Sequence, residues 1–135
     1  MEAIKRFFTR DRFAAYCDIE LLEVGEGHAK AKMDIREHHL NGLGIVHGGA
    51  IFTLADLAFA VASNSHGTVA VSINAHISNV KSASSGTLYA EARETSISHK
   101  IGTYAVDITN EKGELIALFE GMVYRKKDQI DLSGT

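Results

Sequence analysis

The fold is decided by residues 47–65, which read HGGAIFTLADLAFAVASNS. Apolar side chains occupy nearly every position of this stretch, so a helix formed here has no continuous polar face and should be buried on all sides. With a rise of ~1.5 Å per residue, such a helix would be roughly 30 Å long, about the width of a small domain. The rest of the chain offers little helical material. We therefore expect a sheet that curls around this helix.

The segments that flank this helix alternate apolar and polar side chains with a period of two, which indicates half-buried strands. Strands are predicted over residues 28–35, 69–80, 87–97, 103–109 and 115–124. The short, turn-like links at 82–86, 98–102 and 110–114 imply that the strands they join are antiparallel neighbours. The sequence thus predicts an α+β fold, with a curved antiparallel β-sheet wrapped around one long central α-helix.

The chain has 135 residues, which suits a single domain because domains cluster at roughly 100–150 residues. Near its start, residues 1–17 carry Ile4, Phe7 and Phe8 at helical spacing. This spacing favours an N-terminal amphipathic helix docked on the domain over a transit peptide. Residues 127–135 show no periodicity and are predicted to form a flexible tail.

Composition excludes several classes of function. A net charge of −3 argues against a general nucleic-acid binder, which normally carries a basic field. Residues 48–63 are shorter than the roughly 20 residues of a membrane-spanning helix, and Asp56 lies near their centre. The single Cys17 excludes an internal disulfide and every multi-cysteine metal site. We expect a cytoplasmic protein that has neither nucleic acid nor membrane as a partner.

Asp56 is the most informative residue, because Thr53 is the only other polar side chain within residues 50–62. A buried carboxylate is costly unless it is paired, neutralised or used. One interpretation is structural: Asp56 bonds to a backbone group or a serine hydroxyl at a subunit contact. The other is catalytic, since burial raises the pKa of an aspartate toward the range in which a general base works.

The sequence His47-Gly48-Gly49 opens the same helix. The first helical turn leaves N–H groups unpaired at the positive end of the dipole, so it binds an anion or the oxyanion of a carbonyl under attack. Glycine also suits close packing against a strand, and both interpretations stay open. Gly48 and Asp56 lie eight residues apart, or roughly 12 Å along one helix. A functional pair therefore requires two antiparallel helices in a homodimer with two composite sites.

The remaining polar motifs are weaker signals. Asn41 and Gly42 precede the helix and fit either a turn or a carbonyl ligand. His38 and His39 are adjacent and would point apart, so no histidine spacing indicates a metal site. The strand over 69–80 should carry on one polar face Ser72, Asn74, His76 and Ser78. Neither a nucleophile elbow of the Gly-x-Ser-x-Gly type nor a glycine-rich phosphate loop occurs.

Residues 41–56 read NGLGIVHGGAIFTLAD, and this run closely resembles the hotdog-fold acyl-CoA thioesterases of the phenylacetic-acid-degradation (PaaI) type. Their pattern is Asn-Gly, a short spacer, His-Gly-Gly, and then Leu-Ala-Asp inside the long helix. The continuation LAFAVASN at 57–64 and the hairpin KGELIA at 112–117 are also similar. The resemblance covers about residues 11–126.

The resemblance implies a role for each matching residue. Asp56 would act on the thioester as general base or as nucleophile, and the Gly48 N–H of the other subunit would bind the oxyanion. His47 and Asn41 would support the substrate carbonyl, and Ser72 would lie near the attacking water. The residues implied to hold coenzyme A are Gly49, Lys81, Ser82, His99 and Lys100. No metal and no cofactor is implied, because coenzyme A is part of the substrate.

We therefore expect a homodimer, assembled into a dimer-of-dimers tetramer, that hydrolyses an acyl- or aryl-CoA to free acid and coenzyme A. One alternative is a non-catalytic acyl-CoA-binding or regulatory hotdog module, although the buried charge of Asp56 counts against it. The other is a hotdog hydratase. Such enzymes pair a carboxylate with a histidine at the active site. The helix has no histidine apart from His47 and His66 at its two ends, which counts against a hydratase.

Overall fold

The computed structural model describes residues 1–134, so Thr135, the last residue of the predicted tail, lies outside them. The elements in chain order are α1 (Glu2–Phe8), α2 (Arg12–Tyr16), β1 (Ile19–Gly25), β2 (His28–Asp34), the 3₁₀ turn η1 (Glu37–His39), α3 (Gly48–Asn64), β3 (Thr68–Asn79), β4 (Thr87–Ile97), β5 (Ile101–Thr109) and β6 (Leu115–Gln129). None of the helices within these described residues has both the length and the hydropathy needed to cross a membrane.

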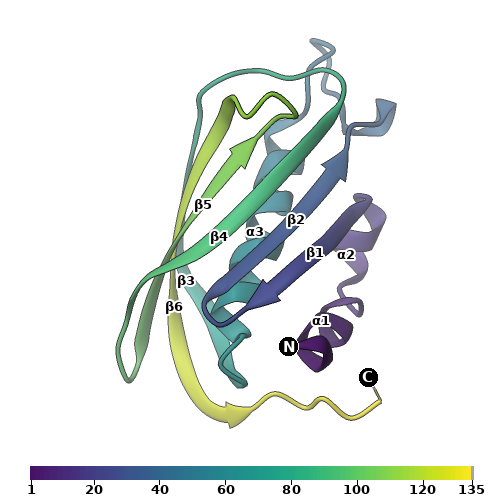
Figure 1. Ribbon diagram of the computed structural model, residues 1–135. Coiled ribbons are helices and arrows are strands. Elements are labelled where there is room, and N and C mark those ends of the chain that lie inside the picture. Colours follow the sequence, from purple (N-terminus) through teal and green to yellow (C-terminus); the bar gives the residue numbers. More distant parts are fainter. Residues whose placement is uncertain (135) are drawn as a thin grey trace.

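Six antiparallel strands form one sheet in the order β1-β2-β4-β5-β6-β3. The sheet curves around α3, and the two short N-terminal helices lie beside β1 (Figure 1). The predicted α+β class, the central helix and the five predicted strands are confirmed.

Aromatic side chains determine where α3 packs on the sheet. The ring of Phe59 lies 5.8 Å from that of Tyr104 and 5.3 Å from that of Phe119, in edge-to-face and tilted arrangements that aromatic pairs prefer. On β6, a Cβ added to Gly121 would lie 2.6 Å from the Phe59 ring. Glycine at this position therefore lets the helix approach the sheet closely.

One stripe of α3 is not covered by the sheet. Phe52, Thr53, Asp56 and Ala60 are only half-buried and recur at three- and four-residue spacing, so they share one helix face. The prediction of a helix buried on all sides is wrong for a single chain. The sheet covers only the opposite face, and the stripe surrounds the carboxylate of Asp56.

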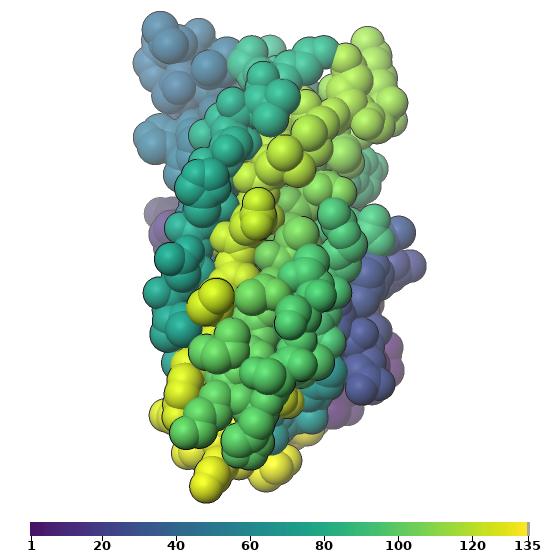
Figure 2. Space-filling view, turned by 90° about the vertical axis from the view of Figure 1, so that its left-hand side faces the viewer, coloured from purple at the N-terminus to yellow at the C-terminus, as the bar shows by residue number. Residues whose placement is uncertain are grey.

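Strand β3 lies at the edge of the sheet beside β6, and the prediction that it neighbours β4 is wrong. The link over residues 80–86 is short, yet it crosses the end of the sheet instead of making a hairpin. Along the way Val80 N–H donates to Ile116 O, and Val46 N–H donates to Ala83 O. Figure 2 shows β3 (teal) along the margin of the sheet, next to β6 (yellow). The other two predicted antiparallel neighbours, β4–β5 and β5–β6, are confirmed.

Strand β1 was not predicted, and a β-bulge explains why. Its pairing with β2 shifts between Leu21 and Glu23, so Leu22 is an extra residue and the alternation of apolar side chains is interrupted. A strand without a clean period of two gives no sequence signal of the kind used for the other strands.

Both ends of the chain are more ordered than predicted. The N-terminal segment forms two helices instead of one, because Asp11 caps the start of α2 with a hydrogen bond from Ala14 N–H of 2.9 Å. Strand β6 continues through Gln129, and the Ile130 N–H donates to Gly67 O at 2.9 Å. The predicted tail therefore starts too early: the side chain of Ile130 is buried against the core.

Candidate active site

The first turn of α3 presents one unpaired backbone donor. His47 is the N-cap, and its Nδ1 accepts the Gly49 N–H at 2.8 Å. The Ala50 and Ile51 N–H groups donate to His47 O at 2.9 and 3.2 Å. The Gly48 N–H has no acceptor among residues 1–134. This exposed donor lies at the positive end of the helix dipole.

The reason for a glycine differs between the two glycine positions of this turn. A Cβ on Gly49 would lie 3.0 Å from Nδ1 of His47, so glycine makes room for the capping imidazole. A Cβ on Gly48 would meet only Asn79 Nδ2, at an ordinary contact distance of 3.9 Å. Close packing within the chain therefore explains Gly49 but not Gly48, and Gly48 remains available to a ligand.

Asn41 organises the loop before the helix. Its Oδ1 accepts the Leu43 N–H at 2.8 Å, and its backbone N–H donates to Ile45 O at 2.8 Å. The turn interpretation is thus confirmed. The side-chain Nδ2 makes no hydrogen bond within the described part of the chain. Together with Gly48, Asn79 and Ser82, Asn41 lines a pocket of about 280 Å³.

Asp56 lies two helical turns beyond Gly48, on the uncovered stripe of α3. Its carboxylate has no hydrogen bond or ion pair to any of residues 1–134, so within one chain it has no structural partner. Burial raises the pKa of Asp56 above its ordinary value, and the negative charge of Asp11 raises it further. A half-buried, unpaired carboxylate of this kind is suited to take up a proton.

Asp11 was missed by the sequence interpretation. Its Oδ1 is occupied as the cap of α2, but its charge still acts on Asp56. The signal was available as an aspartate at the start of a short apolar run, which is typical of a helix N-cap. Its proximity to Asp56 was not available, because it depends on how α2 docks against α3.

Ser72 faces the helix side of the sheet, which corrects the predicted polar face of β3. The pairing of β3 with β6 shifts between Ser72 and Asn74, which leaves Ile73 as a bulge. Ser72 therefore pairs with buried Val123 and shares its face, whereas Asn74 pairs with Met122 on the convex side. Only three of the four predicted polar residues lie together: Asn74, His76 and Ser78.

The residues implied to hold coenzyme A do not form one group within a chain. Lys81 and Ser82 line the pocket at the start of α3, and Lys81 is ion-paired with Glu114. His99 and Lys100 lie in the β4–β5 turn at the other end of β4. A strand of 11 residues spans roughly 35 Å, so one phosphate group cannot contact both pairs.

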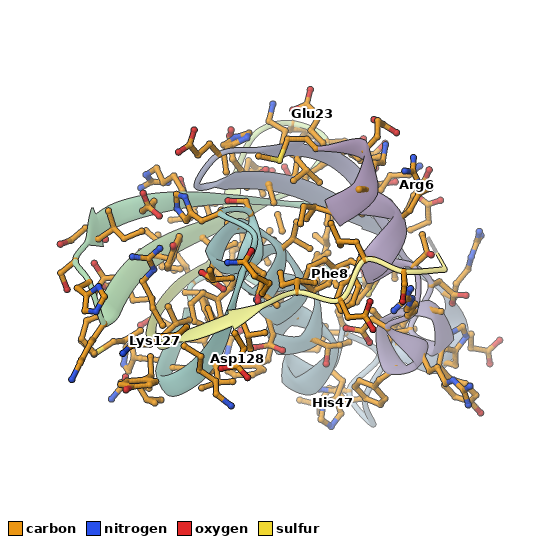
Figure 3. The ribbon with its side chains drawn as sticks, turned by 90° about the horizontal axis from the view of Figure 1, so that it is seen from below. Arg6, Phe8, Glu23, His47, Lys127 and Asp128 are labelled. Carbon is orange, nitrogen blue, oxygen red and sulfur yellow. The ribbon has the colours of Figure 1, made fainter. Side chains whose placement is uncertain are left out.

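The β4–β5 turn borders a basic pocket that the sequence interpretation did not find. Its volume is about 460 Å³, and it is lined by Thr68, His99, Lys100, Tyr124, Arg125, Lys126, Lys127 and Asp128. Figure 3 shows Lys127 and Asp128 beside the end of β6. The run Arg125-Lys126-Lys127 was visible in the sequence, but it bordered the residues assigned to a tail, so no site was expected there.

A cluster of Asp18, His38 and His39 is the only metal-type grouping within residues 1–134. The two imidazoles do not point apart as predicted: in a 3₁₀ turn, unlike a strand, neighbouring side chains diverge only partly, and the ring centres lie 4.4 Å apart. Both ring nitrogens of His39 are already used, since Nδ1 accepts from Arg36 N–H at 2.9 Å and Nε2 donates to Cys17 O at 2.7 Å. The cluster therefore stabilises the loop and offers a metal no free His39 nitrogen.

Comparison with known sequences identifies relatives along most of the chain. The sequence profile of the Thioesterase superfamily matches residues 43–117. A protein of Archaeoglobus fulgidus is 43% identical over 127 residues, which cover 93% of this chain and 82% of that protein. The acyl-coenzyme A thioesterase PaaI of Escherichia coli K12 is 34% identical over 119 residues, with coverage of 87% and 85%.

Solved structures agree with these matches. The structure of the E. coli PaaI protein from the phenylacetic acid degradation operon superposes with a TM-score of 0.91 at 32% identity, covering 96% of this chain and 94% of that one. A Streptococcus mutans protein solved with bound acetyl-CoA superposes with a TM-score of 0.79 at 25% identity, with coverage of 83% and 91%.

Proposed function

Because the chain belongs to the thioesterase superfamily, we propose that it hydrolyses acyl-CoA thioesters at a site shared between two protomers. The observation that carries this proposal is the unpaired Asp56 carboxylate on the same helix as the unpaired Gly48 N–H. Thioester hydrolysis needs a proton acceptor or nucleophile and a donor for the developing oxyanion. Asp56 and Gly48 supply one group of each kind, and neither group has a hydrogen-bond partner among residues 1–134.

Two protomers are required because the groups lie roughly 12 Å apart along one helix. The surface that would join the protomers is β3, a 12-residue edge strand that exposes Val71 and Ile73. A long exposed edge strand is a template for pairing with another chain. Antiparallel pairing of two β3 strands would bring the uncovered stripes of the two α3 helices together and set Gly48 of one protomer opposite Asp56 of the other.

The reaction follows from these positions. The Gly48 N–H, preorganised by the His47 cap, donates to the carbonyl oxygen and stabilises its negative charge as the tetrahedral intermediate forms. Asp56 either takes a proton from the attacking water or attacks the carbonyl itself. As base, Asp56 passes that proton to the leaving thiolate when the C–S bond breaks, so coenzyme A leaves as the thiol and water supplies the oxygen of the acid. As nucleophile, Asp56 expels the thiolate and forms an acyl anhydride, which water then hydrolyses to the acid, releasing the proton that the thiolate takes up. In this proposal the free Nδ2 of Asn41 orients the carbonyl, and Ser72 binds the water.

The nucleotide of coenzyme A is assigned to the basic pocket at the β4–β5 turn. Its phosphates are anionic, and His99, Lys100 and Arg125 line this pocket. In an antiparallel dimer the β4–β5 turn of one protomer lies toward the Gly48 end of its partner. That arrangement unites the two implied groups of coenzyme A ligands, with Lys81 and Ser82 supplied by one chain and the basic pocket by the other.

Pairing of dimers into a tetramer is the further part of the proposal. Its support is the convex face of the sheet, where Tyr89, Leu118 and Tyr124 expose large apolar side chains.

The decisive experiment measures free thiol release from acyl-CoA by the wild type and by Asp56→Asn and Asp56→Ala. We expect both variants to lose about 10²–10⁴-fold in kcat while remaining dimeric by light scattering. The matched control is Asp107→Asn, which removes an aspartate paired with Arg93 at the surface, where such pairs contribute little. Binding of acyl-CoA without thiol release by the wild type would instead support a regulatory module, and hydration without thiol release would support a hydratase.

The shared site has its own test. Asp56→Ala and Gly48→Pro each damage one half of the site, so a mixed dimer retains one intact site. Coexpression of the two inactive variants in equal amounts should restore about one quarter of wild-type activity. No recovery would show that both groups act within one chain.

A further inference from the structure

A second cavity lies next to the catalytic helix and is not used by the mechanism above. It has a volume of about 270 Å³ and lies between α1, α2, α3 and β1. Its apolar lining includes Phe8, Ala14, Ile19, Leu21 and Leu57. Figure 3 shows Phe8 directed from α1 toward the interior, where it packs against the core.

Two residues connect this cavity with the proposed active site. Leu57 lines it and directly follows Asp56 on α3. Asp11 lines it as well, and the charge of Asp11 raises the pKa of Asp56. Ala15 is exposed yet also lines the cavity, so it stands at the mouth. The cavity therefore adjoins the turn of α3 that carries Asp56, although Asp56 does not itself line it.

The volume and charge of the cavity restrict what can enter. An apolar cavity of about 150 Å³ accommodates benzene, so on that scale 270 Å³ accommodates about ten carbon atoms. The acidic groups of Asp11 and Glu20 line the cavity together with one cation, Lys5, whose ammonium group donates to Leu22 O at 3.1 Å. An acyl group that ends in a carboxylate would therefore be repelled and desolvated there.

Resting on the proposed function, we infer that the helix pair α1–α2 forms the acyl pocket and that the substrates are neutral, apolar acyl-CoA thioesters of up to about ten carbons. The two N-terminal helices thus set the upper size of the acyl group. Acyl chains of sixteen carbons exceed the cavity, and acetyl groups leave it empty.

The test uses a substitution that narrows the mouth of this cavity without disturbing the hydrophobic core. Ala15→Leu adds three carbons at an exposed position, so the fold should be retained. We expect kcat/KM for octanoyl-CoA to fall about tenfold or more, because added bulk in an apolar pocket discriminates by about 10–200-fold. With acetyl-CoA, kcat/KM should change by less than about threefold, since this acyl group does not reach the cavity.

The matched control is Ala3→Leu, the same change on the opposite face of α1 from Lys5, Phe8 and Thr9, which should alter neither value. Equal loss with octanoyl- and acetyl-CoA, or no loss with either, would overturn the assignment of the cavity while leaving the thioesterase proposal intact. Absence of thiol release from every acyl-CoA by the wild type would instead overturn both. Faster hydrolysis of palmitoyl-CoA than of octanoyl-CoA by the wild type would overturn the size limit alone.

Discussion

Replacing Gly48 by proline would remove one hydrogen-bond donor from the proposed active site and change little else. The Gly48 N–H has no acceptor among the described residues, so proline would break no bond within the chain. Gly48 is the first residue of α3, where proline is well tolerated because its fixed φ suits the helix. His47 before it is extended, with φ −60° and ψ 134°, as a residue preceding proline prefers.

The expected magnitudes differ sharply between catalysis and stability. Loss of one oxyanion donor lowers kcat by about 10²–10³-fold, or about 2.7–4 kcal/mol of transition-state stabilisation. Proline at a compatible position raises the free energy of unfolding by about 0.4–1 kcal/mol, because the unfolded chain loses freedom. Gly48→Pro should therefore be at least as stable as the wild type and nearly inactive.

The assay pairs thiol release with thermal unfolding at one fixed protein concentration, since an oligomer's Tm depends on concentration. Gly48→Ala is the comparison variant. It adds a Cβ at the same place, 3.9 Å from Asn79 Nδ2, but keeps the N–H, so it should lose far less activity than Gly48→Pro. If proline and alanine reduce kcat equally, or if Gly48→Pro keeps kcat within about threefold, the oxyanion role of this donor is refuted.

Three further predictions follow from contacts described above. His47→Ala should lower the free energy of unfolding by about 0.5–2 kcal/mol, because the N-cap is lost. His47→Asn should restore this stability, as measured by thermal unfolding. If His47→Asn does not also restore kcat, the imidazole does more than cap the helix. Asp11→Asn keeps the cap of α2 but removes a negative charge beside Asp56, so the pKa of Asp56 should fall and the acidic limb of the pH–kcat profile should move to lower pH. An unchanged limb would mean that Asp56 is not the titrating group. Gly121→Ala places a Cβ 2.6 Å from the Phe59 ring and should destabilise the fold by about 1–3 kcal/mol in denaturant unfolding, whereas a neutral effect would show that α3 can shift away from β6.

The fold was predictable where one local pattern decides the structure. The apolar run of α3 predicted a helix against the core, and the alternation of β2 and β4 predicted strands with one buried face; the structure contains all three. Three of the failures share one cause. The bulges at Leu22 and Ile73 and the placement of β3 beside β6 depend on pairing between distant segments, and no local pattern records which strand will be the partner.

The candidate site was likewise predictable only where the local sequence was unusual. The helix start at His47–Gly49 and the aspartate within the apolar helix were recognisable, because each is unusual in its immediate sequence. The charge of Asp11 near Asp56 and the gathering of Lys100 with Arg125 were not, because each joins residues from different elements. Local sequence indicated the groups that we propose to react, whereas tertiary packing determined what surrounds them.

The exposed backbone of β3 has a consequence for the newly synthesised chain. In a single chain, alternate residues of this 12-residue edge strand direct unpaired amide and carbonyl groups away from the sheet, where an extended polypeptide can pair with them. No proline interrupts this strand, and its two irregularities, at residues 68–70 and at Ile73, leave residues 74–79 regular enough to pair. If two copies of the chain pair along β3 as proposed, the pairing also protects the newly synthesised chain, because it covers both exposed edges at once.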